Sequence, residues 1–465
     1  MKTAIILGAG PTGLAAALEL AQNHYQVIVF ERDPVVGGIS KTAEYHGYRF
    51  DMGGHRFFTK NHEVEAWWHE TLKSDFIRTP RLSRIYYNRR FFKYPIVIKD
   101  ALHNAGIGPA FLWFLSYLRY KIKPIRPETS FADWVTNRFG KRLFETFFKS
   151  YTEKVWGIPT TELSAEWAVQ RIKGLSLWEA IRNALFQPKA KTTSLIEEFD
   201  YPKYGPGMMY DAVAERIRAA GGQVLTGCQV SGIQLQEGKV VGIEVTQDGV
   251  KTTHSADVVV STIPLPDTLT LLYPGQAGVE ASAKNMRFRD FISVNLIVDK
   301  AEIFPDNWIY VHDPAVKMGR IQNFKNWSRW MTPTQDHSPV GCEYFCTEGD
   351  ALWNTPDEEL LELAATELKA IGLGGNAAIR DGCVCRVRNA YPMYTGPYTA
   401  AITHARTLLA GISNLEVAGR GGMFRYNNMD HSILSGWLAA RKLMGQDCNP
   451  WDANTDAEYH EEQKS

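Results

Sequence analysis

Three glycines and one glutamate near the start of the chain have the types and spacing to bind phosphates and a ribose. The glycines form the series Gly8-x-Gly10-x-x-Gly13, between the apolar strand pattern 3–7 and the helical pattern 14–22. Gly8 permits a tight strand-to-helix turn, Gly10 lets the backbone approach a pyrophosphate, and Gly13 allows close packing of helix on sheet. Free N–H groups at the helix start would face the phosphates. The spacing predicts a dinucleotide site.

The glutamate narrows the choice of dinucleotide. A second strand pattern at 26–30 ends at Glu31, eighteen residues after Gly13. A carboxylate at this place accepts hydrogen bonds from a ribose, and its charge disfavours a ribose 2′-phosphate. We therefore expect FAD or NAD rather than NADP.

Two later glycine pairs favour FAD. Gly37-Gly38 follows the ribose acid, and Gly53-Gly54-His55 follows the run 50–52. This order resembles the flavoprotein superfamily of amine oxidases, protoporphyrinogen oxidases and sugar-nucleotide mutases. In that superfamily such glycines let the backbone lie close to a flat ring and its phosphates. Ordinary turns are the alternative interpretation of either pair alone.

The end of the chain sharpens the resemblance. The run Phe-Arg-Tyr-Asn-Asn-Met-Asp-His at 424–431 follows a glycine-rich turn at 419–422, and it resembles the closing motif of the UDP-galactopyranose mutases. In that family N5 of reduced flavin attacks the anomeric carbon of a UDP-sugar, expels the diphosphate and lets the ring reclose at a different size. Shorter pieces occur in the mutase order within residues 1–445: Gly53-Gly54-His55, Tyr94-Pro95, 151–157, Gly319-Arg320-Ile321 and Tyr391-Pro392.

The resemblance implies roles for individual residues. Arg320 would contact the diphosphate, and Tyr426 and Tyr391 would donate to it, because guanidinium forks match phosphate oxygens and phenols donate without adding charge. Tyr94 would lie near the uracil, and His55 would sit by the flavin. The sugar-nucleotide cleft would be lined by Tyr151, Lys154, Trp156 and Asn428. The expected catalytic residues are His55, Arg320 and Tyr426. The expected FAD contacts are Gly8, Gly10, Pro11, Thr12, Gly13, Glu31, Arg32, Gly37, Gly38, Gly54, His55, Val230, Gly419, Arg420, Met429, Asp430 and His431.

Several of these residues have a structural alternative. Arg320 could be a paired arginine on a central strand. Tyr94 and Tyr391 precede prolines and could simply pack at a rim. His55 could cap the backbone of its glycine loop, and Asp430 could be the N-cap of the next helix.

Two positions depart from the mutase pattern. Mutases carry a second pyrophosphate arginine after the segment similar to 151–157, and here Arg171, Lys173 and Arg182 compete for that role without a matching context. Eukaryotic mutases read uracil with a glutamine three residues after the tyrosine of the Tyr-Pro pair, where this chain has Val97. The loss of one such contact costs about 1–3 kcal/mol. Whether the substrate is linked to UDP therefore remains an open question.

The composition excludes some partners. The 465-residue chain has 51 basic and 51 acidic residues, so no global field attracts nucleic acid. The first strand begins at residue 3, which predicts no secretory signal and a cytoplasmic protein. The six cysteines lack metal-ligand spacing, and the pair Cys383 and Cys385 fits a strand alternation. We expect reduced thiols and no metal.

One segment could contact a membrane. Residues 107–125 are rich in aromatic and aliphatic side chains and include Arg119, Lys121 and Lys123. The segment is too short and too polar to span a bilayer. A helix docked on its own domain is the main interpretation, and binding at a membrane surface is the alternative.

The elements that position these residues form an α/β protein with two domains and an insertion. A discontinuous, Rossmann-like FAD-binding domain takes residues 1–80, 203–264 and 408–450, where buried strand and helix patterns recur. A mostly helical insertion at 81–202 opens with a hairpin pattern around Asn88-Arg89. Residues 265–407 predict an antiparallel-sheet substrate domain, and 453–465 form a polar tail.

Two other classes of protein fit the same fingerprint. An oxidoreductase similar to protoporphyrinogen oxidase or amine oxidase would accept hydride from an apolar or amine substrate. A non-catalytic protein resembling the Rab GDP-dissociation inhibitors would bind proteins and lipids, but the intact glycines with Glu31 argue against it. The mutase hypothesis requires reduced flavin and a small-molecule substrate such as a nucleotide sugar, with no net oxidation. The sequence leaves the oligomeric state open.

Overall fold

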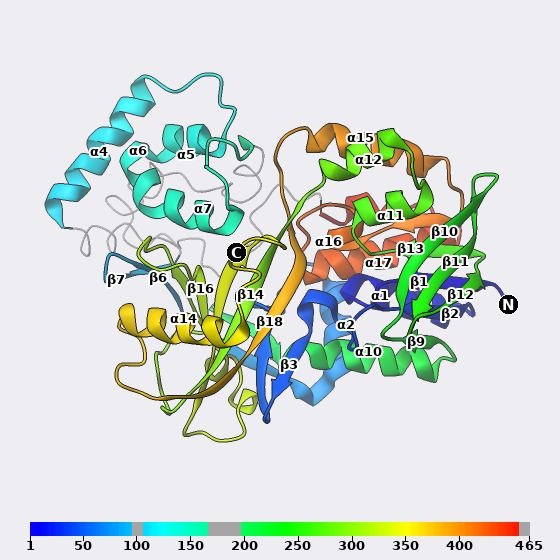
Figure 1. Ribbon diagram of the computed structural model, residues 1–465, viewed down its shortest axis with the longest axis horizontal. Coiled ribbons are helices and arrows are strands. Elements are labelled where there is room, and N and C mark those ends of the chain that lie inside the picture. Colours follow the sequence, from blue (N-terminus) through cyan, green and yellow to red (C-terminus); the bar gives the residue numbers. More distant parts are fainter. Residues whose placement is uncertain (95–105, 166–196, 455–465) are drawn as a thin grey trace.

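The computed structural model describes residues 1–94, 106–165 and 197–454 (Figure 1). It contains a five-stranded parallel sheet that collects three distant parts of the chain. The strand order is β19-β13-β1-β2-β9, and every neighbouring pair is parallel. The strands are β1 (Thr3–Leu7), β2 (Gln26–Phe30), β9 (Gln223–Leu225), β13 (Val258–Ser261) and β19 (Leu415–Val417). Their near-continuous apolar sequences suit a sheet that is covered on both faces.

Each face of this sheet has its own cover. On one face, alternate residues such as Ala4 and Ile6 pack with α1 (Pro11–Gln22), α10 (Gly207–Ala219) and α17 (Met429–Leu443). On the other face, Ile5 and Leu7 pack with a meander of β10 (Gln229–Gln236), β11 (Lys239–Gln247) and β12 (Val250–Ser255). Both sets are fully buried because strand side chains alternate between faces.

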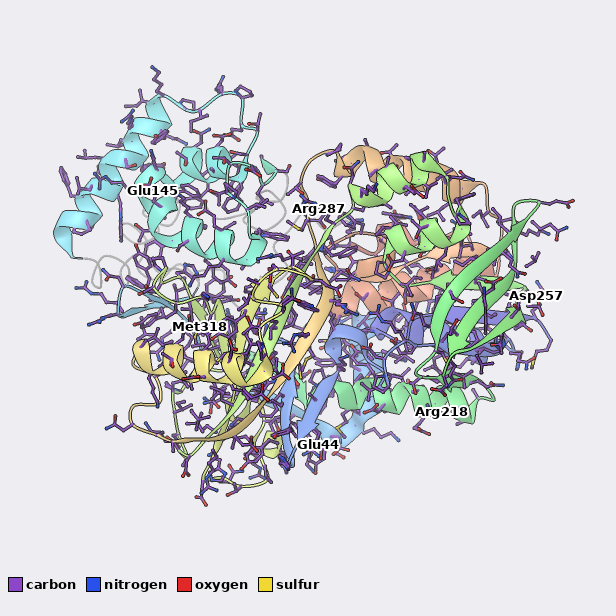
Figure 2. All side chains as sticks on the ribbon, viewed as in Figure 1. Glu44, Glu145, Arg218, Asp257, Arg287 and Met318 are labelled. Atoms are coloured by element: carbon purple, nitrogen blue, oxygen red, sulfur yellow. The ribbon has the colours of Figure 1, made fainter. Side chains whose placement is uncertain are left out.

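A second, seven-stranded sheet forms the other large part of the molecule. Its order is β18-β14-β17-β16-β15-β6-β7, and all pairs are antiparallel except β15 with β6. α14 (Asp357–Ala370) packs on its apolar face. In Figure 2 the labelled Arg287 lies between the two sheets, just before β14 begins. The strands are β6 (Ser83–Tyr87), β7 (Arg90–Lys93), β14 (Phe288–Val298), β15 (Trp308–Val311), β16 (Arg320–Asn323), β17 (Ser338–Cys346) and β18 (Ile379–Pro392).

The hairpin β6–β7 joins this second sheet, although the sequence placed it with the helical insertion. It is held there by parallel pairing of β6 with β15, a partner more than two hundred residues away. Likewise β8 (Glu198–Pro202) pairs with β5 (Phe76–Pro80) outside the helices. Within the predicted insertion 81–202, the described helices lie between β7 and β8. They are α4 (Ile107–Ile122), α5 (Phe131–Phe139), α6 (Lys141–Phe144), a π-helical turn (Glu145–Lys149) and α7 (Ser150–Trp156).

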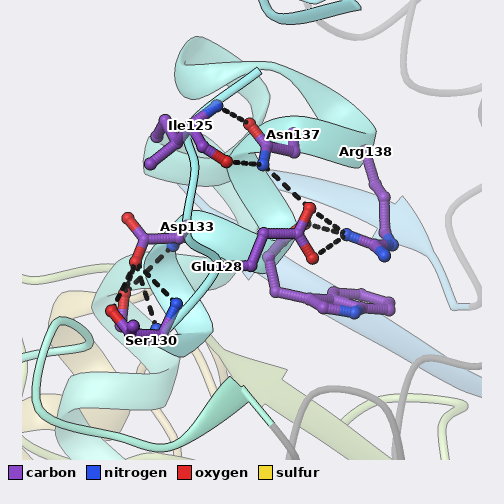
Figure 3. Close-up of polar contacts among 8 residues, drawn as sticks. Ile125, Glu128, Ser130, Asp133, Asn137 and Arg138 are labelled. Carbon is purple, nitrogen blue, oxygen red and sulfur yellow. Dashed lines mark hydrogen bonds and ion pairs between the residues drawn. The ribbon is translucent and has the colours of Figure 1, made fainter.

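Polar contacts fix the start of α5 and the loop before it (Figure 3). The Ser130 hydroxyl accepts from the Asp133 amide at 3.1 Å, and the Asp133 carboxylate accepts from the Ser130 amide at 3.1 Å. This capping box satisfies two N–H groups of the first turn. Asn137 bonds both backbone groups of Ile125, and Glu128 accepts from Arg138 at 3.0 Å. The connection from α4 to α5 is therefore held in one conformation.

The remaining α-helices and strands of the described residues complete the fold. They are β3 (Thr42–Tyr45), β4 (Tyr48–Asp51), α2 (His62–Leu72), α11 (Leu265–Leu272), α12 (Ala277–Lys284), α13 (Phe324–Trp327), α15 (Tyr398–Ala410) and α16 (Gly419–Gly422). Within the described ranges no helix has the length and apolar character needed to cross a membrane. All six cysteines are free thiols, and Cys383 and Cys385 alternate along β18.

Candidate active site

A cavity of about 1020 Å³ runs from the glycine turn after β1 to the face of the second sheet. Its walls come from the ends of β1 and β2, the short helix α16 (Gly419–Gly422), the turn before α17, strands β14, β16 and β18, and helix α7. Ligand sites in proteins have this concave form, with a few polar groups in a mostly apolar wall.

The glycine turn has the geometry of a phosphate-binding loop. Gly8 has a φ of +98°, which a residue with a side chain would rarely adopt. A Cβ at Gly13 would collide with the carbonyl oxygen of Gly8, so only glycine lets α1 start this close to β1. Gly10 is the N-cap of α1 and lines the cavity with Pro11 and Thr12. The N-terminus of α1, with its free N–H groups, opens into the cavity.

Glu31 lies beside this turn. Its carboxylate accepts hydrogen bonds from the amides of Ala9 at 2.7 Å and Asp33 at 2.9 Å. Burial raises the pKa of Glu31, and the two amide donors oppose that rise. The carboxylate is thus fixed at the wall of the cavity, where it and Arg32 can meet a ligand.

Three of the glycines predicted to touch the cofactor do not line the cavity. Gly13, Gly37 and Gly419 instead allow close backbone packing: Gly37 has a φ of +101° beside Lys41, and a Cβ at Gly419 would collide with Thr12. The other predicted FAD contacts line it: Gly8, Gly10, Pro11, Thr12, Glu31, Arg32, Gly38, Gly54, His55, Val230, Arg420, Met429, Asp430 and His431.

His55 carries a buried nitrogen that has no partner among the described residues. Its Nδ1 atom is inaccessible to solvent and makes no hydrogen bond. Burial lowers the pKa of His55 to about 3, and the positive charges of Arg420 and Arg320 add to the effect. The imidazole is therefore neutral at ordinary pH. A flat polar group in the cavity would supply the missing partner, so the residues present fit an FAD.

Arg320 forms an ion pair and also lines the cavity. Its Nε donates to both oxygens of Glu343 at 2.9 Å, and its Nη2 bonds the same carboxylate. Glu343 faces it from β17 and is fully buried. Nη2 also lies 3.4 Å from the Tyr391 hydroxyl. None of these contacts uses Nη1, and a fork held this rigidly suits recognition of an anion.

Two tyrosines and a second arginine continue this wall. The rings of Tyr391 and Tyr426 are stacked, with centroids 5.9 Å apart and planes 17° apart. The guanidinium carbon of Arg420 lies 4.5 Å from the Tyr426 ring centroid, within cation–π range. Arg420 also donates to the carbonyl oxygens of Asn427 and Ala390 at 2.9 and 3.0 Å. Burial raises the pKa of Tyr391, so this phenol stays a donor.

Further aromatic rings line the same cavity. Tyr151 stacks on His312 with ring centroids 4.6 Å apart, and the ring centroids of Tyr94 and Tyr310 lie 4.7 Å apart. Burial, followed by the charge of Lys154, lowers the pKa of His312 to about 3. Trp156 and Asn428 also line the cavity. The structure thus brings seven predicted substrate residues into one cavity with most of the predicted FAD contacts: Tyr94, Tyr151, Trp156, Arg320, Tyr391, Tyr426 and Asn428.

Two expectations about single residues were wrong. Lys154 does not line the cavity: its ammonium donates to the carbonyl oxygens of Val311, Asp313 and Met318 at 3.1, 2.5 and 3.2 Å. Asp430 is not the N-cap of α17, because Asn428 occupies that position. Asp430 lies in the first helical turn, and its Oδ2 accepts from the Thr59 hydroxyl at 2.9 Å.

Other predicted positions lie outside the described residues. They are Arg171, Lys173 and Arg182, the candidates for the second pyrophosphate arginine, together with Pro95 and Val97.

Several polar residues that line the cavity were not predicted as site residues, among them Arg56, Tyr310, His312, Arg388 and Arg425. Arg56 and Arg425 are direct neighbours of His55 and Tyr426, so their motifs already pointed to them. Arg388 pairs with Glu348 at 2.5 Å and is half exposed. Tyr310 and His312 carried no local signal, because they reach the cavity through the pairing of β15.

Comparison with known proteins agrees with this architecture. A probable UDP-galactopyranose mutase of Klebsiella pneumoniae is 28% identical over 173 residues, which span 35% of this chain and 43% of that protein. A 1-hydroxycarotenoid 3,4-desaturase of Flavobacterium sp. (strain P99-3) is 49% identical over 65 residues, 14% of this chain and 13% of that protein. The matched stretches thus span less than half of these relatives.

A solved structure of reduced UDP-galactopyranose mutase is similar over nearly the whole fold. The TM-score is 0.85 with 22% sequence identity, covering 98% of this chain and 100% of that chain. The profile of the flavin-containing amine oxidoreductases matches residues 11–444. The chain belongs to this family. It is a flavoenzyme with FAD as its cofactor.

Proposed function

We propose that this flavoenzyme acts on a sugar joined to a nucleoside diphosphate and isomerises the sugar ring at its anomeric carbon. The observation that carries the proposal is the group of arginines that lines the same cavity as the glycine turn. Five arginines line that cavity outside the ribose-binding end: Arg56, Arg320, Arg388, Arg420 and Arg425.

The chemistry at the sugar belongs to the cofactor. Bound FAD in its reduced form would supply a nucleophilic N5 for the anomeric carbon. The residues that would hold it are the glycine turn with Glu31 at one end and Gly54, His55 and the start of α17 at the other.

The protein's own task is to bind and stabilise a leaving diphosphate. Arg320, locked against Glu343, presents a fixed guanidinium, and positive charge at a departing oxyanion lowers the barrier to its release. Tyr391 and Tyr426 donate hydrogen bonds without adding charge. His55 stays neutral, so it leaves the electrostatics of the cofactor end unchanged and can exchange a hydrogen bond there.

The test is a product assay on the reduced holoprotein. We expect that a nucleotide sugar, with UDP-galactopyranose tried first, is converted to an isomer of the same mass that chromatography separates, while the flavin spectrum is the same before and after. Tyr426→Phe should slow conversion, and Tyr45→Phe on β3 is the matched control, because Tyr45 does not line the cavity. If the reduced holoprotein forms no isomer from any nucleotide sugar tested, the proposal is contradicted.

An oxidoreductase is the second candidate, and one observation favours it. Part of the same cavity is lined by uncharged rings: Phe131, Phe147, Phe148, Trp156, Phe291 and Phe345. Such a wall suits an apolar substrate that gives up a hydride. Anaerobic mixing of the oxidised holoprotein with apolar alkenes and amines tests this candidate. A compound that transfers a hydride to the flavin reduces it and must therefore bleach its absorbance.

A further inference from the structure

Helix α4 is apolar on two sides, and the protein body packs against one of them. The Trp113 ring lies 5.5 Å from Phe147, which lines the cavity. Tyr117 is buried, and a Cβ at Gly140 would lie 2.6 Å from its backbone nitrogen. The Ser116 hydroxyl accepts from the Arg142 amide at 3.2 Å. These contacts confirm that the helix docks on its own domain, as expected.

The opposite side of α4 is apolar and faces solvent. Six of the twelve large apolar side chains that are exposed in the described ranges lie on this helix, with exposed fractions from 38% to 83%. Single exposed apolar residues are common, whereas a contiguous group marks an interaction site. The six are Phe111, Leu112, Phe114, Leu115, Leu118 and Ile122.

The spacing of these residues makes a continuous stripe with positive edges. Residues 111, 115, 118 and 122 are three or four apart, so they share one face of the helix. At about 100° per residue, Arg119 and Lys121 lie on opposite edges of that face. Both are exposed, and Lys123 and Arg126 follow. No acidic residue occurs from 106 to 127.

The helix presents this stripe from a fixed position. In Figure 1 α4 lies at the end of the molecule opposite the N-terminus, on the outer side of α5 and α6. The contacts of Ile125, Glu128 and Asn137 in Figure 3 hold the chain that leaves it.

We propose that α4 docks this enzyme on the surface of an anionic lipid bilayer. Phe111, Leu115, Leu118 and Ile122 enter the boundary between headgroups and acyl chains, while Arg119 and Lys121 reach phosphates on either side. An apolar centre between two positive edges matches a bilayer interface, where apolar chains lie beneath anionic headgroups. The helix lies in the interface and does not cross it.

Vesicle sedimentation of the full-length holoprotein tests the proposal. We expect binding to vesicles of equal parts phosphatidylcholine and phosphatidylglycerol, weaker binding to pure phosphatidylcholine, and a loss of the difference at high KCl. The double variant Phe111→Ser with Leu115→Ser should weaken partitioning by about tenfold or more. Lys121→Glu with Lys123→Glu should remove the preference for phosphatidylglycerol.

A matched control separates a specific surface from general stickiness. Val241→Ser with Val250→Ser replaces two other exposed apolar residues, on β11 and β12, and should bind vesicles as the wild type does. Unchanged flavin absorbance and unfolding temperature will show that each variant is folded, which the exposure of the replaced side chains favours.

Three results would overturn the proposal. The first is wild-type protein that stays in the supernatant with anionic vesicles. The second is a Phe111→Ser, Leu115→Ser variant that binds like the wild type. The third is light scattering that shows a concentration-dependent dimer, lost in that variant, together with no vesicle binding; this would assign the stripe to a second copy of the chain.

Discussion

Replacement of Arg320 by alanine should damage stability and substrate binding through different contacts. The Glu343 carboxylate has no exposed surface, and the Arg320 side chain is 17% exposed. Removal of one partner of a buried ion pair costs about 3–5 kcal/mol, because the other charge stays buried without compensation. Gln322 still donates to Glu343 at 2.8 Å, so we expect a value toward the lower end of that range.

A double variant separates the two effects. Arg320→Met with Glu343→Gln removes both charges, keeps the side-chain volumes and leaves an amide oxygen for Gln322. We expect it to recover about 2 kcal/mol or more of the lost stability. Affinity for a nucleotide sugar should remain lost, because the guanidinium is still missing.

The assays are urea unfolding of the holoprotein and titration of the flavin spectrum with a nucleotide sugar. Arg84→Ala is the matched control, because Arg84 makes a two-pronged pair with the fully buried Asp306 at 2.8 and 2.6 Å and does not line the cavity. The Arg84→Ala variant should lose a similar amount of stability and keep its affinity for the nucleotide sugar. A cost of less than about 1 kcal/mol for Arg320→Ala would refute the buried-pair reasoning. Normal affinity in the double variant would refute the anion contact.

Three further predictions concern the cofactor end and pH. Gly13→Ala should abolish FAD retention, because its methyl group would collide with the Gly8 carbonyl. Gly278→Ala, whose Cβ would meet nothing closer than 3.9 Å, should keep a full flavin content, and equal content in both would contradict the packing argument. Burial raises the pKa of Asp51 from 3.8 to about 8, so the folded protein holds a proton that the unfolded chain releases. Unfolding measured across this range should show stability falling as pH rises from about 4 to about 8, and Asp51→Asn should flatten that fall; an unchanged slope would exclude Asp51. Burial lowers the pKa of His312 from 6.5 to about 3, so stability should fall as pH drops from about 6.5 toward 3. His312→Phe keeps an aromatic ring stacked on Tyr151 and should lower the pH dependence of the unfolding free energy by the equivalent of one proton. An unchanged pH dependence would assign the effect to other groups.

Much of the cofactor end could be predicted because its signals are local. The turn at Gly8 and Gly13 needs particular backbone geometry within six residues, and only glycine provides it. The strands β1 and β2 are short apolar runs that end at functional residues, and Glu31 follows the second directly. Such features depend on chain neighbours, so the sequence contains them.

The substrate end could be predicted only in part, since its contacts join distant segments. The partner of Arg320 is Glu343, and the register of β16 on β17 brings them together. The place of β6 depends on β15, which follows much later in the chain. The cap of α17 was misplaced by two residues, because asparagine and aspartate are equally good caps and local preference could not choose between Asn428 and Asp430.

Titration of the holoprotein with nucleotide sugars in both flavin oxidation states tests the proposed function most directly. We predict a saturable change of the flavin spectrum and tighter binding of UDP-sugars to the reduced protein than to the oxidised protein. Indifference of both forms to every nucleotide sugar would contradict it, and bleaching of the oxidised flavin by an apolar or amine substrate would establish the oxidoreductase instead.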